Sequence, residues 1–257
     1  MKSRSIALLF VVAIFVGCGT SGRPKLNTIS IEDEWQLGAQ MARDLSQQLN
    51  LVNDADALTY LRNIGERMVA QSNMASLPWE FHIVRDDQAN AFSIPGGHVY
   101  ITTGLIKSVH NTSELAAAVA KQVAHVVGRQ EAQALSHQYG VNTIANAAAG
   151  KNASAYQQIV AQAMSKQSVA PFTPDQEREA DDTAINLMDK AGYDAKGLGN
   201  LFRTLLADKT KAARYLASHP INEDRIKDVD DKASKLTKRA TVITDEPEFH
   251  TIRERLQ

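Results

Sequence analysis

The sequence of 257 residues contains a single cysteine and has almost no net charge, and each shortage excludes a class of protein. One cysteine cannot form an internal disulfide or a cysteine-based zinc knuckle. Lys and Arg number 28 against 29 Asp and Glu, so the chain lacks the basic excess that binds nucleic acid, and we expect no nucleic-acid partner. The hydrophobic fraction of 44% is too high for a disordered chain.

Long apolar runs are also missing. The run at residues 6–16 follows a short basic start and has too few residues to cross a bilayer as a helix, which takes about 20. A basic start, a short apolar stretch and a small residue at its end are typical of a secretory signal. We therefore expect a signal peptide over residues 1–17.

The lone cysteine directly follows this stretch. Gly17-Cys18 resembles a bacterial lipobox, which implies a diacylated Cys18 and a lipid-anchored tether over residues 18–29. Gly19 after the cysteine favours the outer membrane, so the resemblance implies a cell-envelope protein that faces the periplasm. The alternative is an ordinary signal peptide with an incidental cysteine.

The rest of the sequence indicates one α+β domain, mostly helical with a small sheet, over residues 30–235. Apolar spacing and capping residues predict helices, and alternating or turn-bounded stretches predict strands. We expect helices from Ser30 and over 54–72, 111–128 and 175–191, and strands at 79–83 and 99–103. Two mobile helices are expected around Gly150 within 129–170. Two further helices are expected later in the chain, separated by residues 218–220. Residues 236–257 are expected to pack on this domain.

A Pro-Gly-Gly turn lies between the predicted strands. The residues of interest are Ile94, Pro95, Gly96, Gly97 and His98. We expect an exposed edge strand near residues 94–100, which could add a polypeptide as a further strand.

Four segments resemble one enzyme family in order and spacing. They are Asn90–Gly97, the helix with the pentad Lys121-Gln122-Val123-Ala124-His125, the run Glu177–Asp181, and Ser218-His219-Pro220 with Arg225. Over about residues 30–230 the chain resembles the HtpX and CAAX prenyl protease family of zinc metallopeptidases (peptidase family M48), in its Oma and BepA type. The resemblance implies a metallopeptidase-like fold whose sheet lies beside the zinc helix, and a polypeptide substrate or client.

The family's His-Glu-x-x-His motif places two zinc-binding histidines one helical turn apart, with the general-base Glu after the first. The resemblance assigns His125 and Glu177 to ligand positions and Asp181 to the carboxylate behind them. It also assigns His219 and Arg225 to the late active-site element. Zinc is the cofactor that the family implies.

The pentad departs from that motif at two positions. Lys121 stands at the first ligand position, and an ammonium group has no lone pair for a metal. Gln122 stands at the general-base position, and an amide cannot take up the proton. We therefore expect zinc to be absent or weakly bound, and no hydrolysis by the usual mechanism.

The loss of zinc would leave Glu177 and Asp181 facing a vacancy, and unpaired buried charge is costly. We predict that the ammonium of Lys121 lies within salt-bridge distance of one of them; the alternative is that Lys121 reaches out to solvent. His125, Glu177 and His219 form a conceivable rearranged metal site. His98 is expected near the cleft, and His82, His110, His137 and His250 are expected at the surface.

Three functions remain open. The leading hypothesis is a lipid-anchored envelope protein that binds polypeptide clients in a protease-like cleft without cleaving them, within an envelope protein complex or as an adaptor. The second is an active zinc metalloendopeptidase with a non-standard site, engaged in protein quality control. The third is a structural envelope lipoprotein whose cleft has no ligand.

Overall fold

The structure is a computed structural model that describes residues 29–169, 171–236 and 241–256. The predicted signal peptide, Cys18 and most of the predicted tether lie outside this part of the chain. Within it, no helix combines the length and the apolar character that crossing a membrane requires.

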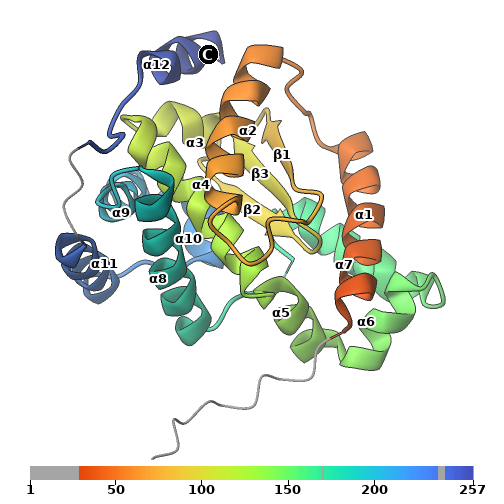
Figure 1. Cartoon of the computed structure of the whole chain (residues 1–257). Helices are drawn as coiled ribbons and strands as arrows, with labels where there is room; N and C mark the ends of the chain where they lie inside the picture. The colour runs from red at the N-terminus through yellow and green to blue at the C-terminus, as the bar shows by residue number, and fades with distance from the viewer. Residues whose placement is uncertain (1–28, 170, 237–240, 257) are drawn as a thin grey trace, which may run out of the picture.

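The fold is α+β, as the sequence predicts, with many helices around a small three-stranded sheet (Figure 1). In chain order the elements are α1 (Ile31–Gln48), α2 (Ala55–Val69), β1 (Glu80–Val84), β2 (Ala91–Ile94), β3 (His98–Thr102), α3 (Thr103–Ser108), α4 (Thr112–Val127), α5 (Gln130–Tyr139), α6 (Val141–Ala148), α7 (Ala153–Lys166), α8 (Pro174–Ala191), α9 (Gly197–Ala207), α10 (Ala213–Ser218), α11 (Glu223–Lys235) and α12 (Pro247–Arg255).

Helix α4 runs through the middle of the molecule, with α8 and α9 on one side and the sheet on the other (Figure 1). It begins where the side chain of Asn111 accepts a hydrogen bond from the backbone N–H of Glu114, as the sequence predicts. Small and apolar residues cover most of its circumference, so nearly the whole helix is buried. Any polar side chain on α4 must therefore find its partners inside the protein.

The sheet has the order β1-β3-β2, with β3 parallel to β1 and antiparallel to β2. Val99 and Ile101 on β3 point to the core beneath α2 and α4. Tyr100 points to the opposite face, where α1 supplies Leu37 and Met41 to a second core cluster. The sheet thus separates two apolar clusters.

The turn between β2 and β3 lies between the two tryptophans of the chain. Gly96 and Gly97 have φ angles of +87° and +90°, a region that L side chains rarely adopt. A Cβ added at Gly96 would lie 3.5 Å from the Cα of Trp35, and one at Gly97 would lie 3.4 Å from the ring of Trp79. The Pro-Gly-Gly turn predicted from the sequence is therefore confirmed, and it is closely packed.

The segment 129–170 contains three helices, where the sequence predicts two. The additional break lies at Gly140, whose φ of +84° separates α5 from α6. Leu135, Ile144 and Ile159 are fully buried in the cluster that α1 shares. These helices form a packed layer against α1, which contradicts the expectation of a mobile pair.

The described C-terminal third has two helices that the sequence does not predict, the short α10, which ends at Ser218, and α12. Helix α12 packs near α2, and its Phe249 and Ile252 belong to the main core cluster. Helices α8 and α9 pack on α4, and α11, which carries Arg225, packs on both α8 and α9.

Candidate functional site

The predicted site lies where α8 crosses α4. Lys121 and His125 are one turn apart on α4, and Glu177 and Asp181 are one turn apart on α8, so each pair projects from one helix face. All four side chains are buried. Together with His219 and Arg225 we call them the α4–α8 cluster.

The ammonium of Lys121 lies between the two carboxylates. Its Nζ is 2.8 Å from Glu177 Oε2 and 3.0 Å from Asp181 Oδ1, and it donates to the backbone carbonyl of Glu177 at 3.2 Å. The side chain of Lys121 has no exposed surface. The prediction of a salt bridge is therefore confirmed for both carboxylates, and the solvent-facing alternative is wrong.

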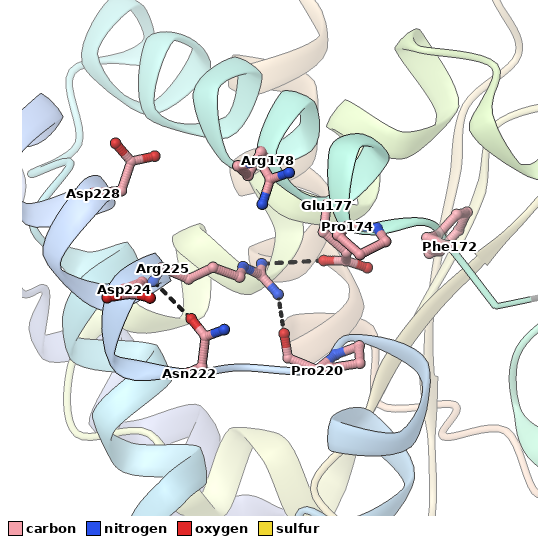
Figure 2. Close-up of a pocket in the computed structure, with 9 residues that line it drawn as sticks. All are labelled: Phe172, Pro174, Glu177, Arg178, Pro220, Asn222, Asp224, Arg225 and Asp228. Atoms are coloured by element: carbon pink, nitrogen blue, oxygen red, sulfur yellow. Dashed lines mark hydrogen bonds and ion pairs between the residues drawn. The ribbon is translucent and has the colours of Figure 1, made fainter.

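Arg225 supplies a second cation to the same carboxylates. Its Nη2 lies 2.7 Å from Asp181 Oδ2 and 3.1 Å from Glu177 Oε2, and its Nε donates to Asp181 at 2.9 Å. Its Nη1 donates to the carbonyl of Pro220 (Figure 2). Two buried carboxylates thus face two permanent cations, and their charges cancel.

The histidines of the cluster form a second layer. His219 Nδ1 lies 2.8 Å from Glu177 Oε1, and His125 Nε2 lies 3.9 Å from the same oxygen. The rings of His125, Phe172 and His219 pack together, with centroid distances of 4.0 Å from His125 to Phe172, 5.0 Å from His125 to His219 and 5.5 Å from Phe172 to His219. His125 Nδ1 lies 2.7 Å from Gln130 Oε1, whereas its Nε2 has no hydrogen bond to any residue that the structure describes.

The amide of Gln122 occupies the predicted general-base position. Its Nε2 is 3.4 Å from His219 Nε2, and its Oε1 accepts from the Ser93 hydroxyl at 3.2 Å. The Ser93 hydroxyl also makes a short contact with the buried carboxyl of Glu131, so the three side chains form one hydrogen-bonded group. The position is therefore filled by a hydrogen-bonded amide that has no basic lone pair.

Burial and neighbouring charges shift the pKa values of Glu177 and His125 in the cluster. Burial raises the pKa of Glu177, but the neighbouring His219 and Lys121 outweigh it and hold that pKa below its usual range. Burial, reinforced by the charge of Lys121, lowers the pKa of His125 well below the usual value. Glu177 is therefore a carboxylate and His125 a neutral imidazole at neutral pH.

The donor set does not fit zinc in the family's arrangement. The first ligand position holds an ammonium group, which places a positive charge 2.8 Å from the Glu177 carboxylate that would bind the metal. A dication would add charge to a buried group that is already balanced, at a cost that these neighbours do not offset. Ligand atoms of His125, Glu177 and His219 do lie within 4.8 Å of one another, so the structure brings the predicted rearranged set together.

A cavity of about 400 Å³ adjoins the cluster. Figure 2 shows Phe172 and Pro174 along one side of it and Pro220 and Asn222 along another, with Arg225 reaching toward Glu177 between them. The wall combines apolar rings with charged groups of both signs. This composition suits a polypeptide better than a uniformly charged ligand.

The remaining predicted site residues lie as follows. Ile94 ends the edge strand β2, Pro95, Gly96 and Gly97 form the turn, and His98 begins the central strand β3. The prediction of an exposed edge strand near residues 94–100 is wrong, since all seven residues are buried and, apart from Ile94 on β2, the strand in this range is the central β3. The edge strand beside Gln122 is β2, through Ser93.

Sequence reasoning missed Phe172 and Glu131. Phe172 follows a proline outside any predicted element, so no periodicity places it on His125. Glu131 lies on the helix after the pentad and is fully buried. A carboxyl three residues beyond the predicted end of the buried helix was the available signal, but the sequence does not show that β2 brings Ser93 next to it.

Comparisons with known proteins agree with this geometry. A model of peptidase family M48 matches residues 56–233, and the chain belongs to this family. The beta-barrel assembly-enhancing protease of Escherichia coli (strain K12) is 27% identical over 241 residues, which is 89% of this chain and 49% of that protein. A putative beta-barrel assembly-enhancing protease of Vibrio cholerae is 32% identical over 222 residues, covering 80% of this chain and 45% of the relative.

A mitochondrial relative is similar as well. The mitochondrial metalloendopeptidase OMA1 of Schizosaccharomyces pombe is 27% identical over 218 residues, 82% of this chain and 64% of the relative. The chain spans about half the length of the bacterial relatives. The Oma- and BepA-like resemblance predicted from the sequence is confirmed.

Proposed function

We propose that this chain is a family member that does not hydrolyse peptide bonds and that binds polypeptide in the cavity beside the α4–α8 cluster. The observation that carries the proposal is the ammonium of Lys121, 2.8 Å and 3.0 Å from the two carboxylates at the position of the family's first ligand. This contact replaces the charge of a metal with a charge built into the chain.

The chemistry of Gln122 supports the same conclusion. Hydrolysis by the family's mechanism needs a metal to activate water and a base to take its proton. The amide of Gln122 accepts from Ser93 and does not act as a base. Loss of a general base alone typically lowers a rate by about 10²–10⁴-fold, and here the first ligand is missing as well.

The cavity and the relatives support a polypeptide ligand. Phe172 offers an aromatic face, and Asn222 and Arg225 offer hydrogen-bonding groups. The names of the bacterial relatives describe proteases that enhance the assembly of β-barrels. We infer that the clients here are unfolded envelope proteins, including β-barrel precursors.

The N-terminal features give this proposal its location. We propose a signal peptide over residues 1–17, a lipid on Cys18 and a tether over 18–29. The tether would attach a domain of residues 30–235, with the C-terminal segment 236–257 packed on it, to the periplasmic face of the outer membrane. A radioactive fatty acid supplied to bacterial cells should label the wild-type chain and not a Cys18→Ser variant. Equal labelling of the two chains would exclude the lipid anchor.

The activity test restores the motif. Lys121→His combined with Gln122→Glu recreates two histidines one turn apart and the base between them. We expect no chelator-sensitive cleavage of casein by the wild-type chain and measurable cleavage by the double variant. Chelator-sensitive cleavage by the wild type that disappears in a His125→Gln variant would establish the rearranged site of His125, Glu177 and His219 and overturn the proposal.

Client binding is tested separately with fluorescein-labelled unfolded casein. Phe172→Ala should weaken binding by about tenfold, which corresponds to about 1.4 kcal/mol. The control is Ile31→Ala, which removes an exposed apolar side chain on α1 outside the cavity and should leave the affinity unchanged. Absence of binding by the wild type would favour the structural lipoprotein, and equal losses in both variants would exclude this cavity.

A further inference from the structure

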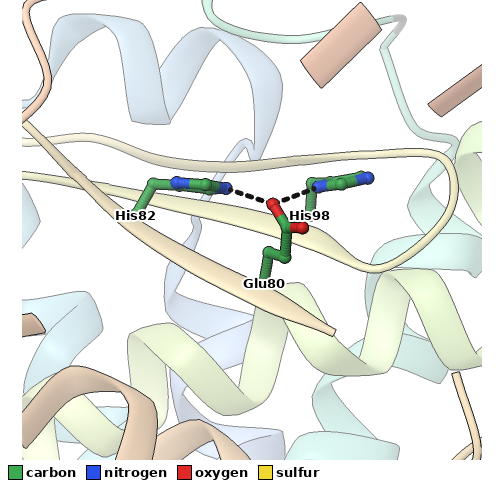
Figure 3. Close-up of side chains that lie close together, drawn as sticks. All are labelled: Glu80, His82 and His98. Atoms are coloured by element: carbon green, nitrogen blue, oxygen red, sulfur yellow. Dashed lines mark ion pairs between the residues drawn. The ribbon is translucent and has the colours of Figure 1, made fainter. Parts of the chain in front are cut away.

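A second group of potential ligands lies on the sheet. Glu80 and His82 alternate on β1 and therefore share a face. His98 on β3 is the register partner of Glu80 in the parallel ladder and projects from the same face. Figure 3 shows the carboxylate of Glu80 between the two imidazole rings.

The three groups converge on one point. His82 Nε2 and His98 Nδ1 are each 3.3 Å from Glu80 Oε2, and all three ligand atoms lie within 4.8 Å of one another. In a tetrahedral zinc site with bonds of about 2.0–2.1 Å, neighbouring ligand atoms are about 3.3–3.4 Å apart. Both histidine–glutamate separations therefore match the edge of such a tetrahedron.

The contact with the Glu80 carboxylate is the one polar contact that the structure gives to these two nitrogens among the described residues. The side chain of His98 is only 8% exposed, and its Nδ1 makes no hydrogen bond to any residue in the described ranges. The same holds for Nε2 of His82, whose ring is held by stacking on Tyr100 at a centroid distance of 4.7 Å. Both nitrogens therefore face the same carboxylate oxygen and lack a well-aligned hydrogen bond.

We propose that Glu80, His82 and His98 bind a divalent transition-metal ion of the zinc class through two imidazole nitrogens and one carboxylate oxygen. Imidazole suits zinc and its neighbours in the first transition series, and a carboxylate completes a three-ligand set.

The surroundings of the three side chains indicate how an ion could reach them and how it would affect the sheet. Glu80 and His82 line a groove of about 340 Å³ along β1, which leaves room for water as a fourth ligand. The ion would join the start of β1 to the start of β3, directly beside the turn at Gly97. It would thus stabilise the end of the sheet that follows the turn.

This site is distinct from the α4–α8 cluster. Glu80, His82 and His98 come from the sheet, whereas His125, Glu177 and His219 come from α4, α8 and the segment after α10. Lys121 neutralises the carboxylate of Glu177 in the α4–α8 cluster. Among the described residues no lysine or arginine forms a comparable ion pair with Glu80. The proposal therefore does not depend on whether the chain hydrolyses peptides.

The test is a metal titration of the full chain after treatment with a chelator. Co²⁺ is the probe, because its visible absorption reports tetrahedral coordination, and Zn²⁺ is then added in competition. We expect one ion per wild-type chain and a rise in the melting temperature on binding. His82→Gln and Glu80→Gln should each weaken binding by more than about 100-fold, since the loss of an outer-shell partner alone costs up to that much.

The controls separate this site from other histidines. His137→Gln alters an exposed histidine on α5 and should leave the affinity unchanged. Glu80 and His82 are partly exposed, so their variants should fold, and melting curves of the metal-free proteins verify this. No binding by the wild type, or binding that is lost in His125→Gln and kept in His82→Gln, would overturn the proposal.

Discussion

Lys121 combines a fully buried side chain with two short contacts to carboxylates. Removing one member of a buried ion group leaves the others without compensation, which typically costs about 3–5 kcal/mol. The two carboxylates of α8 would retain only Arg225 as a permanent cation. Lys121 therefore stabilises the fold by compensating the negative charges of Glu177 and Asp181.

We predict that Lys121→Met lowers the free energy of unfolding by about 3–5 kcal/mol. Chemical denaturation followed by circular dichroism measures it. The control is Lys232→Met, because Lys232 also pairs with two carboxylates but its side chain is 36% exposed, and such surface pairs contribute about 0–1 kcal/mol. Equal losses in the two variants would contradict the importance of burial.

Glu131 titrates in the opposite direction from Glu177. Burial raises its pKa to about 8, although the hydroxyl of Ser93 opposes the shift. An acid whose folded-state pKa lies above its unfolded value binds more protons when folded, so stability falls as the pH rises from about 4.5 through about 8.

Glu131→Gln should therefore flatten the loss of stability between pH 6 and pH 9. We expect the wild type to lose at least about 1 kcal/mol more than the variant over this range. Urea unfolding at both pH values measures the difference, with Glu32→Gln on the exposed first turn of α1 as the control. A wild type and a Glu131→Gln variant with the same pH slope would disprove the buried neutral carboxyl.

At the scale of elements, the position of α1 relative to the sheet depends on its close approach to the β2–β3 turn. A Cβ added at Gly38 would lie 1.8 Å from the backbone oxygen of Pro95, so only glycine allows this contact. A Cβ added at Gly199 on α9 would also meet an oxygen, at 2.2 Å, but that atom is the end of the Asp230 side chain and can move.

We predict that Gly38→Ala lowers the free energy of unfolding by about 1–3 kcal/mol through backbone displacement. Gly199→Ala should stay within about 1 kcal/mol of the wild type, because the better helix propensity of alanine offsets the shift of Asp230. Thermal and urea unfolding of both variants compare them directly. A Gly38→Ala variant as stable as Gly199→Ala would mean that α1 and the turn separate readily.

Elements with strong local signals were predictable, and those fixed by distant partners were not. The apolar spacing and the Asn111 cap predict α4, and the Pro-Gly-Gly turn predicts the start of β3, whereas β2 before the turn was not predicted. The parallel pairing of β1 with β3 has no local signal. One glycine, Gly140, was too weak a signal to divide 129–170 into three helices, and the short α3 and α10 have too few residues for a periodic pattern.

The same distinction applies to the sites. The position of Lys121 followed from sequence, because charge balance with Glu177 requires a cation. His82 was expected at the surface, because the alternation of apolar and polar residues identifies a polar face of a strand but does not show what covers that face. In the structure the His82 side chain is 23% exposed and its ring stacks on Tyr100. Likewise His98, expected near the cleft, belongs with Glu80 because of a register that the sequence does not specify.

At the scale of the whole molecule, the α4–α8 cluster connects the C-terminal helices to α4. Arg225 on α11 pairs with Asp181 and Glu177 on α8, and the same carboxylates hold Lys121 on α4. Helices α5 to α7 pack instead in the second core cluster with α1. The two halves of the molecule therefore depend on different interactions.

We predict that Arg225→Met lowers the hydrogen-exchange protection of α11 by at least about tenfold while leaving α5 to α7 unchanged. The arginine is buried and makes paired contacts with Asp181, so its loss opens this region first. Arg203→Met is the control, because Arg203 also reaches α11, at Asp230, but its side chain is 50% exposed. Uniform loss of protection over both halves would show one cooperative unit.

The β2–β3 turn has a further consequence for how folding of this protein is observed. Trp35 and Trp79 flank that turn, and the chain has no other tryptophan. Intrinsic tryptophan emission therefore reports on α1, β1 and the turn, and is nearly silent about α8 to α11. An unfolding curve recorded by tryptophan emission would follow one end of the sheet, and the buried ion group between α4, α8 and α11 needs a probe of its own.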